Sequence, residues 1–217
     1  MAVMIPSTTG SYLSTAWSMA AGSDLTLMCW GYLSTTNTGT FRNFVNAAPN
    51  TGLSTYSDGL TFDASTQSAD YLGQVLSPGV WYHFCETIFS NGNASSHVIN
   101  GYVNGITEVT ALDTSTFSAF TEIVLGVSPA TFTNPMSGNM RDVRVWQRVL
   151  RADEVVQEMH SARPLHWEAI VGWWPLDDDI FTDRSGNGYI LTETGTVALV
   201  GGPLQTTWPG RGTNFIR

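Results

Sequence analysis

Two stretches of this 217-residue chain show the alternation of side chains that a β-sheet imposes. In residues 80–105 (VWYHFCETIFSNGNASSHVINGYVNG), the first half changes character at every second position, as it does when successive side chains point to opposite faces of a sheet. The stretch ends at Asn104-Gly105, a dipeptide that closes hairpins tightly because both residues readily adopt positive φ. In residues 138–154 (GNMRDVRVWQRVLRADE), Val143 and Val145 share one face. Both stretches predict antiparallel strands.

Other short apolar runs recur along the chain, separated by segments rich in Gly, Ser, Thr and Asn. This pattern is typical of a many-stranded antiparallel sandwich, and such sandwiches commonly form one domain at this length. We therefore predict an all-β fold with two packed sheets, a single domain over residues 1–202 and an extended tail at 203–217. Further strands are expected at residues 11–16, 25–33, 41–45, 53–56, 60–63, 71–75, 122–127 and 190–200.

The chain also carries a specific order of short motifs. They are Trp81–Cys85 (WYHFC), a polar turn, Tyr102–Gly105 (YVNG), Leu125-Gly126 and Gly138–Leu150 (GNMRDVRVWQRVL), followed by an acidic helix start. This order, over residues 25–159, resembles the laminin-G-like jelly rolls of the concanavalin A-like lectin superfamily, of which pentraxins are cousins. The runs at 173–176 (WWPL) and 183–188 (DRSGNG) look like a segment that often accompanies such domains. The resemblance implies an antiparallel two-sheet jelly-roll sandwich with one short helix.

The helix is predicted at residues 152–161. Val155 and Met159 are four residues apart, and acidic residues fill the first turn, where their charge meets the positive end of the helix dipole. In the family that the chain resembles, a serine often caps this helix, whereas here Arg151 stands at that place. The cap is therefore expected to be weaker or to come from another group.

Cys29 and Cys85 are the two cysteines, and both lie in apolar, β-rich segments. An unpaired cysteine in such a segment behaves as a small buried hydrophobe. Pentraxins pair two cysteines at nearly these places. Cys85 falls on one of those two positions, but the other position falls on Met28, one residue before Cys29. A shift of one residue reverses the face of a strand. We therefore expect two reduced thiols, with a Cys29–Cys85 disulfide as the alternative.

The charge of the chain excludes one class of partner. Eighteen acidic residues against nine basic ones give a net charge of −9, so a nucleic-acid backbone would be repelled. No apolar run reaches membrane-spanning length. The N-terminus lacks a basic start followed by a long apolar stretch, so no secretory signal peptide is expected. We therefore predict no nucleic-acid partner and no membrane partner.

No catalytic residue and no cofactor are predicted. Glycosidases place two carboxylates across one bond, and the sequence contains no E-x-D-x-E run, no G-x-S-x-G elbow and no nucleotide-binding loop. The four histidines lack the spacing of a zinc site. In pentraxins an acidic stretch holds calcium, and residues 127–130 (VSPA) replace it here. The acids at 177–179 and Asp183, with Asn187, leave a calcium ion open, because calcium prefers oxygen ligands.

The chain therefore looks like a non-catalytic, lectin-like surface protein. The dipeptides Glu158-Met159 and Arg163-Pro164, with the runs at 173–176 and 183–188, are most similar to stand-alone jelly rolls encoded by bacteriophages. This resemblance implies a virion component, assembled in the host cytoplasm, that decorates a capsid or attaches a tail or fibre and recognises glycans. The alternatives are a free or secreted carbohydrate-binding module, placed extracellularly, and a glycan hydrolase or lyase.

Polar loop residues at the edge of the sandwich are the predicted ligand-binding residues, because amides and carboxylates hydrogen-bond paired sugar hydroxyls. They are Asp58, Asn91, Asn93 and Asn134. The predicted partners are virion proteins, cell-surface glycans and further copies of the chain in a homo-oligomer. Of the tryptophans, Trp167 and Trp208 are expected to be exposed, since most of the others lie in apolar surroundings.

Overall fold

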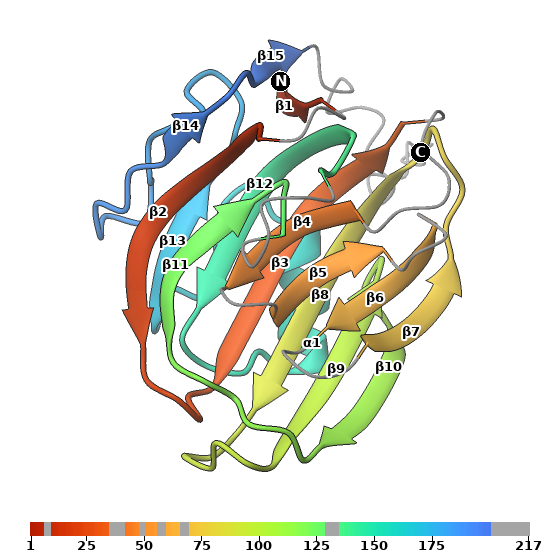
Figure 1. The fold of residues 1–217 in the computed structure, drawn as a ribbon, viewed down its shortest axis with the longest axis vertical. Helices are drawn as coiled ribbons and strands as arrows, with labels where there is room; N and C mark the ends of the chain where they lie inside the picture. The colour runs from red at the N-terminus through yellow and green to blue at the C-terminus, as the bar shows by residue number, and fades with distance from the viewer. Residues whose placement is uncertain are drawn as a thin grey trace, which may run out of the picture.

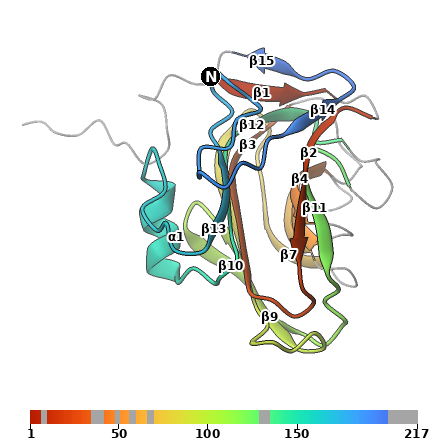
Figure 2. The same cartoon turned by 90° about the vertical axis from the view of Figure 1, so that its left-hand side faces the viewer.

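A computed structural model describes residues 1–6, 10–34, 42–47, 51–55, 60–65, 70–128 and 135–200. Two antiparallel sheets face each other, as predicted for a jelly-roll sandwich (Figures 1 and 2). The eight-stranded sheet, called sheet A, has the order β10 (Ile106–Asp113), β9 (His97–Val103), β8 (Trp81–Phe89), β3 (Leu25–Leu33), β12 (Gly138–Trp146), β1 (Ala2–Ile5) and β15 (Ala198–Val200), and β13 (Ile170–Trp174) also pairs with β12. The seven-stranded sheet, called sheet B, has the order β14 (Thr192–Thr194), β2 (Tyr12–Met19), β11 (Phe120–Leu125), β4 (Arg42–Ala47), β5 (Thr51–Thr55), β6 (Thr61–Ser65) and β7 (Asp70–Val75).

Aromatic side chains from both sheets fill the space between them. The ring of Phe84 on β8 lies 4.7 Å from that of Phe44 on β4 and 5.6 Å from that of Phe62 on β6. Strand β3 is buried along almost its whole length, as its near-continuous apolar run predicts for a strand that is covered on both faces.

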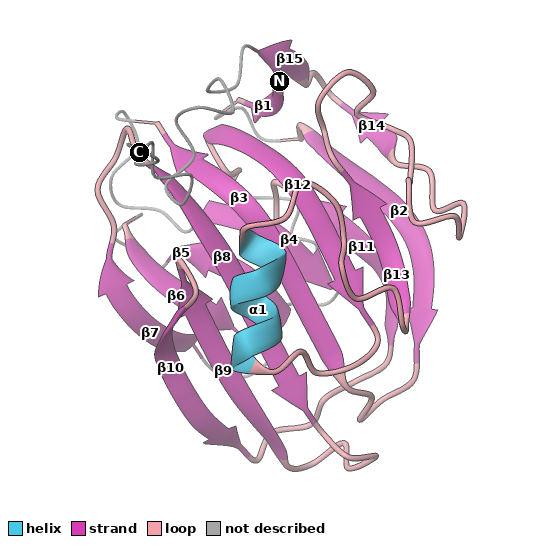
Figure 3. Ribbon diagram, turned by 180° about the vertical axis from the view of Figure 1, so that it is seen from behind, coloured by secondary structure: helices cyan, strands magenta, loops and turns pink. Residues whose placement is uncertain are grey.

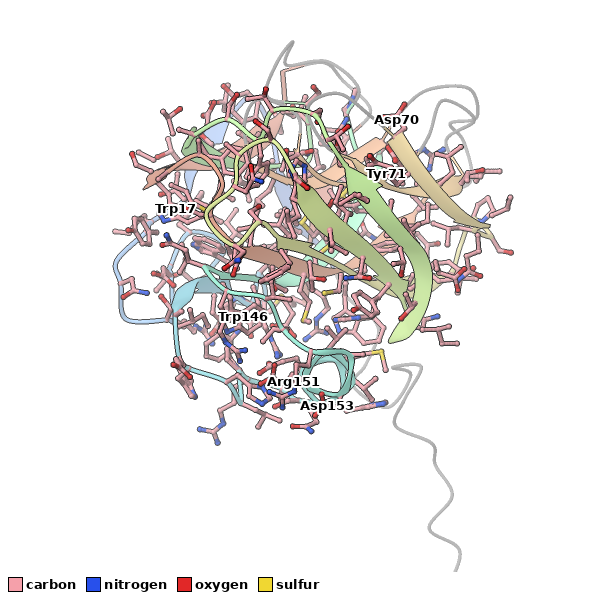
Figure 4. All side chains as sticks on the ribbon, turned by 90° about the horizontal axis from the view of Figure 1, so that it is seen from below. Trp17, Asp70, Tyr71, Trp146, Arg151 and Asp153 are labelled. Atoms are coloured by element: carbon pink, nitrogen blue, oxygen red, sulfur yellow. The ribbon has the colours of Figure 1, made fainter. Side chains whose placement is uncertain are left out.

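The second cover of β3 is helix α1 (Ala152–Met159), which lies on the outer face of sheet A (Figures 2 and 3). Under it lies a buried cluster made of Met28, Cys85, Tyr102, Trp146, Leu150 and Val155. Seen from below, Trp146 lies between the strands and the helix start, where Arg151 and Asp153 are labelled (Figure 4). The helix ends two residues earlier than predicted, and the side chain of Glu154 supplies its cap by accepting the Arg151 backbone N–H at 2.9 Å.

The predicted hairpin at Asn104-Gly105 is confirmed. It joins β9 to β10, and both residues have positive φ, 52° and 77°. The turn packs beside α1, where a Cβ on Gly105 would come within 3.0 Å of Val156. By contrast, the strand predicted at 190–200 is wrong in one respect: β14 and β15 are separate strands in different sheets, and the chain turns at Gly195, whose φ is 75°. The predicted tail, 203–217, lies outside the described residues.

The two cysteines are free, as expected. Cys29 belongs to the core between the sheets, whereas Cys85 belongs to the cluster under α1. They therefore lie on opposite faces of sheet A, and the residue paired with Cys85 across the strands is Met28. A disulfide between Cys29 and Cys85 would require β3 to shift by one residue, which would turn the side chains of its core face towards α1.

We expect the Met28→Cys variant to form a disulfide with Cys85 after mild oxidation, because residues directly opposite across antiparallel strands have neighbouring Cβ atoms. Thiol titration of the denatured, oxidised variant should then find Cys29 alone. The control is Met28→Cys combined with Cys85→Ser, in which both remaining thiols should titrate. If Cys29 rather than Cys85 is consumed, the register of β3 against β8 is wrong.

Candidate functional site

The described residues contain a pocket of about 700 Å³ beside strand β2. Its lining comes from three separate parts of the chain: β2, β11 and the segment that leads into β14 (Figure 1). The lining residues are Ser14, Thr15, Ala16, Thr121, Glu122, Gly188, Tyr189, Ile190 and Thr192. The volume falls within the range that small-molecule sites commonly have, about 300–1,000 Å³.

The pocket exists because β14 is short. It pairs with β2 only from Tyr12 to Ser14, so the segment before β14 runs beside β2 without pairing with it. Ala16 on β2 and Glu122 on β11 are directly opposite each other across the strands. They therefore present their side chains on the same face of sheet B, next to that segment.

Hydrogen bonds hold the segment before β14 in place. The indole N–H of Trp174 donates to the carbonyl of Tyr189 at 2.7 Å, and the Tyr189 backbone N–H donates to Asp183 at 3.1 Å. Gly188 has a φ of 80°, a conformation that glycine adopts without strain. The wall of the pocket is thus formed before any ligand arrives.

The lining residues include serine and threonine side chains and the half-buried Glu122, whose carboxylate is the one charged group among them. Hydroxyl groups both donate and accept hydrogen bonds, and a carboxylate accepts them. The pocket can therefore bind a polar ligand that carries neighbouring hydroxyl groups. Sequence patterns missed these residues, since they lie far apart in the chain and no local spacing links them.

Two of the predicted ligand residues lie outside the pocket. Asn91 and Asn93 are exposed in the turn between β8 and β9, and neither lines the pocket. Asn91 has a φ of 48°, and the side chain of Asn93 accepts the Ser95 backbone N–H at 2.9 Å. Asn91 through its backbone and Asn93 through its side chain therefore help to form the turn. Asp58 and Asn134 lie outside the described residues, and the role of all four in ligand binding stays a prediction.

The acidic residues considered as calcium ligands form hydrogen bonds within their own part of the chain. Asp183 accepts the backbone N–H groups of Trp173, Ser185 and Tyr189 at 3.0, 2.8 and 3.1 Å. Asp179 accepts the Phe181 backbone N–H at 2.9 Å. Within the described part of the chain, no group of three or more His, Cys, Asp or Glu residues is arranged to hold a metal ion.

Two other carboxyl groups have strongly perturbed acidity. Burial, together with the charge of Asp70, raises the pKa of Asp63 to about 7. Burial, together with Asp63, raises the pKa of Glu86 well above its ordinary value. Both side chains are fully buried, at 0 % exposure. Acids of a glycosidase must reach both sides of a sugar bond, and these two cannot touch a substrate while the sandwich is folded.

Among the described residues, no helix is long and apolar enough to cross a membrane. Trp167 is 47 % exposed, as predicted, while Trp208 lies outside the described residues.

Solved structures share this fold at low sequence identity. A putative carbohydrate binding protein from Bacteroides ovatus is 15 % identical with a TM-score of 0.68, over 94 % of this chain and 62 % of that chain. Tailspike protein 2 of Escherichia coli O157:H7 bacteriophage CAB120 is 12 % identical with a TM-score of 0.51, over 78 % of this chain and 26 % of that chain. The present chain thus spans less than two thirds of the length of either protein. At these identities the similarity shows a shared fold.

No curated protein sequence matches the chain. Residues 7–156, which run from before β2 into helix α1, match a protein family described as the concanavalin A-like lectin/glucanases superfamily. Two antiparallel sheets, with the one helix of the described residues on the outer face of sheet A, agree with that match. The chain therefore belongs to the concanavalin A-like lectin/glucanases superfamily.

Proposed function

We propose that this protein is a non-catalytic lectin that binds a glycan in the pocket beside β2. The observation that carries the proposal is the lining, which brings serine and threonine residues of β2, β11 and β14 together with the carboxylate of Glu122. Sugars offer neighbouring hydroxyl groups that such polar side chains can bind. The lectin-like fold, and the carbohydrate binding suggested for the Bacteroides ovatus protein, support this class of ligand.

A catalytic role fits the described residues less well. Of the lining residues, Glu122 alone carries a carboxyl group, whereas hydrolysis of a glycosidic bond generally takes two. Asp63 and Glu86, whose pKa values are raised, have no access to the pocket because both are fully buried. A turnover assay on any glycan that binds tests this: released reducing ends or unsaturated products would establish a hydrolase or a lyase instead.

We expect the Glu122→Gln variant to lose about tenfold in glycan affinity, because a hydrogen bond to a charged group is worth more than one to an amide. An array of immobilised glycans identifies the sugar, and calorimetric titration of that sugar measures the loss. The matched control is Glu108→Gln on β10, where the same change removes a carboxylate that accepts a bond from Gln74, outside the pocket. Equal affinities for both variants would contradict the assignment of the pocket.

We further propose that the protein works on the surface of a bacteriophage virion, as a capsid decoration or a tail or fibre attachment. The sequence resemblance to phage-encoded jelly rolls supports this, and so does the presence of the fold within a phage tailspike. Mass spectrometry of purified particles from the source tests it. Copurification with assembled virions is the expected result; a protein found only outside the particles would favour a free carbohydrate-binding module.

A further inference from the structure

The loop between α1 and β13 exposes two large apolar side chains. Leu165 is 54 % exposed and Trp167 is 47 % exposed, although the helix and strand on either side are partly buried. We call residues 163–168 (RPLHWE) the α1–β13 loop. Tryptophan is enriched among the residues that contribute most of the binding energy at protein interfaces, so an exposed tryptophan two residues from an exposed leucine indicates a candidate interaction surface.

Buried groups hold this loop in one conformation. The carboxylate of Glu158, which is itself buried, accepts the backbone N–H groups of Leu165 and His166 at 2.9 and 2.8 Å. The ring of His166 lies 2.8 Å from the same carboxylate oxygen. From the other side, the indole N–H of Trp146 donates to the carbonyl of His166 at 2.6 Å. The loop is therefore ordered in advance of any contact.

The exposed indole of Trp167 also has a fixed support. Its ring meets that of Trp173 edge-on, with centroids 6.1 Å apart and an interplanar angle of 80°. The indole N–H of Trp173 donates to Asp142 at 2.9 Å, which fixes the supporting ring. Just after the loop, Ala169 has a φ of 56°. Positive φ costs energy in a residue other than glycine, and such strain often marks a functional segment.

Opposite charges flank the apolar pair. Arg163 begins the loop and Glu168 ends it, both are exposed, and neither forms an ion pair with another described residue. Other exposed arginines differ in this respect, because Arg151 and Arg184 are each paired with neighbouring aspartates. The order along the loop is thus positive, apolar, apolar, negative.

We propose that two copies of this chain associate about a twofold axis through their α1–β13 loops. A twofold contact brings the same surface together from both copies, so the surface must complement itself. When the two loops lie antiparallel, Arg163 of each copy faces Glu168 of the other, and Leu165 and Trp167 pack between the two ion pairs. Because the loop is ordered beforehand, association costs little conformational entropy.

Charge reversal tests this arrangement by sedimentation velocity over a concentration series. Arg163→Glu sets like charges against each other across the axis, and so does Glu168→Arg. Each single variant should therefore weaken the dimer by at least about tenfold. The double variant, Arg163→Glu with Glu168→Arg, restores opposite charges at both ends and should recover the dimer. An equimolar mixture of the two single variants should also associate.

The matched control is Arg151→Glu. It reverses an exposed charge at the start of α1, outside the α1–β13 loop, and should leave the dimer intact. Trp167→Ala should weaken the dimer by at least about tenfold as well. A wild-type protein that stays monomeric up to about 0.1 mM would overturn the proposal, as would a double variant that fails to recover. Glu122→Gln should leave the dimer unchanged, so the failure of the glycan proposal and the failure of this one can be told apart.

Discussion

Replacing Arg144 with methionine is expected to lower the free energy of unfolding by about 3–5 kcal/mol, because the change leaves buried carboxylates without their cation. The guanidinium of Arg144 is fully buried and binds Asp142 through two bonds, of 2.9 and 2.6 Å. It also pairs with Glu158 and donates to the carbonyl of Ser161 at 2.6 Å. Burial alone would lower the pKa of Arg144, but Asp142 and Glu158 raise it, so the cation persists.

The loss of stability should be measurable by urea unfolding followed by tryptophan fluorescence, since Trp146 and Trp173 lie close to the ion pairs of Arg144. Arg151→Met is the matched control, because its side chain is 70 % exposed and pairs with the exposed Asp153. An exposed pair contributes much less than a buried one, because water and salt screen the two charges. If Arg144→Met lost no more than this control, the ion pairs beneath α1 would not stabilise the fold in the way described.

Replacing Asp63 with asparagine is expected to stabilise the protein by about 4 kcal/mol at neutral and alkaline pH, with no gain near pH 4. The folded pKa of Asp63 is raised from 3.8 to about 7, chiefly by burial. The contribution of the protonated acid is therefore complete below pH 3.8 and disappears as the pH rises towards 7. Asparagine stays neutral throughout, and it can keep the bonds to Ser54 and to the Tyr71 backbone N–H.

The comparison must be the difference between variant and wild type at each pH. Burial lowers the pKa of His83 from 6.5 to about 3, so the contribution of this neutral histidine is lost as the pH falls below 6.5. In the wild-type profile His83 and Asp63 oppose each other, but His83 cancels in the difference. Urea midpoints between pH 4 and pH 8 give the measurement. A gain that does not change with pH would show that Asp63 is not the titrating group.

Elements with strong local patterns could be predicted from the sequence. The run at 25–33, the alternation at 81–86 and the Asn104-Gly105 turn each carry enough information within a few residues to determine strand or hairpin. Helix α1 was also predictable, because its apolar spacing and acidic first turn agree. The free cysteines followed from register, since a shift of one residue moves a side chain to the other face.

Two short strands that escaped prediction, β1 and β13, take their stability from distant partners. β1 has four residues and β13 has five, and both pair with the same side of β12, one after the other. At such lengths local propensity is weak, and only the neighbouring strand makes the extended backbone favourable. The pocket beside β2 was missed for the same reason, because its lining depends on where β14 ends rather than on a motif.

The pairing of β1 with β15 has a mechanical consequence. These strands are antiparallel, with Ala2 opposite Val200 and Met4 opposite Ala198, so the first and last described strands begin and end side by side. A force that pulls Ala2 away from Val200 acts at one end of this strand pair. It would break the hydrogen bonds between β1 and β15 one after another from that end, instead of shearing them all at once. Under tension this margin of sheet A would peel first, and the packed sandwich behind it would keep its shape.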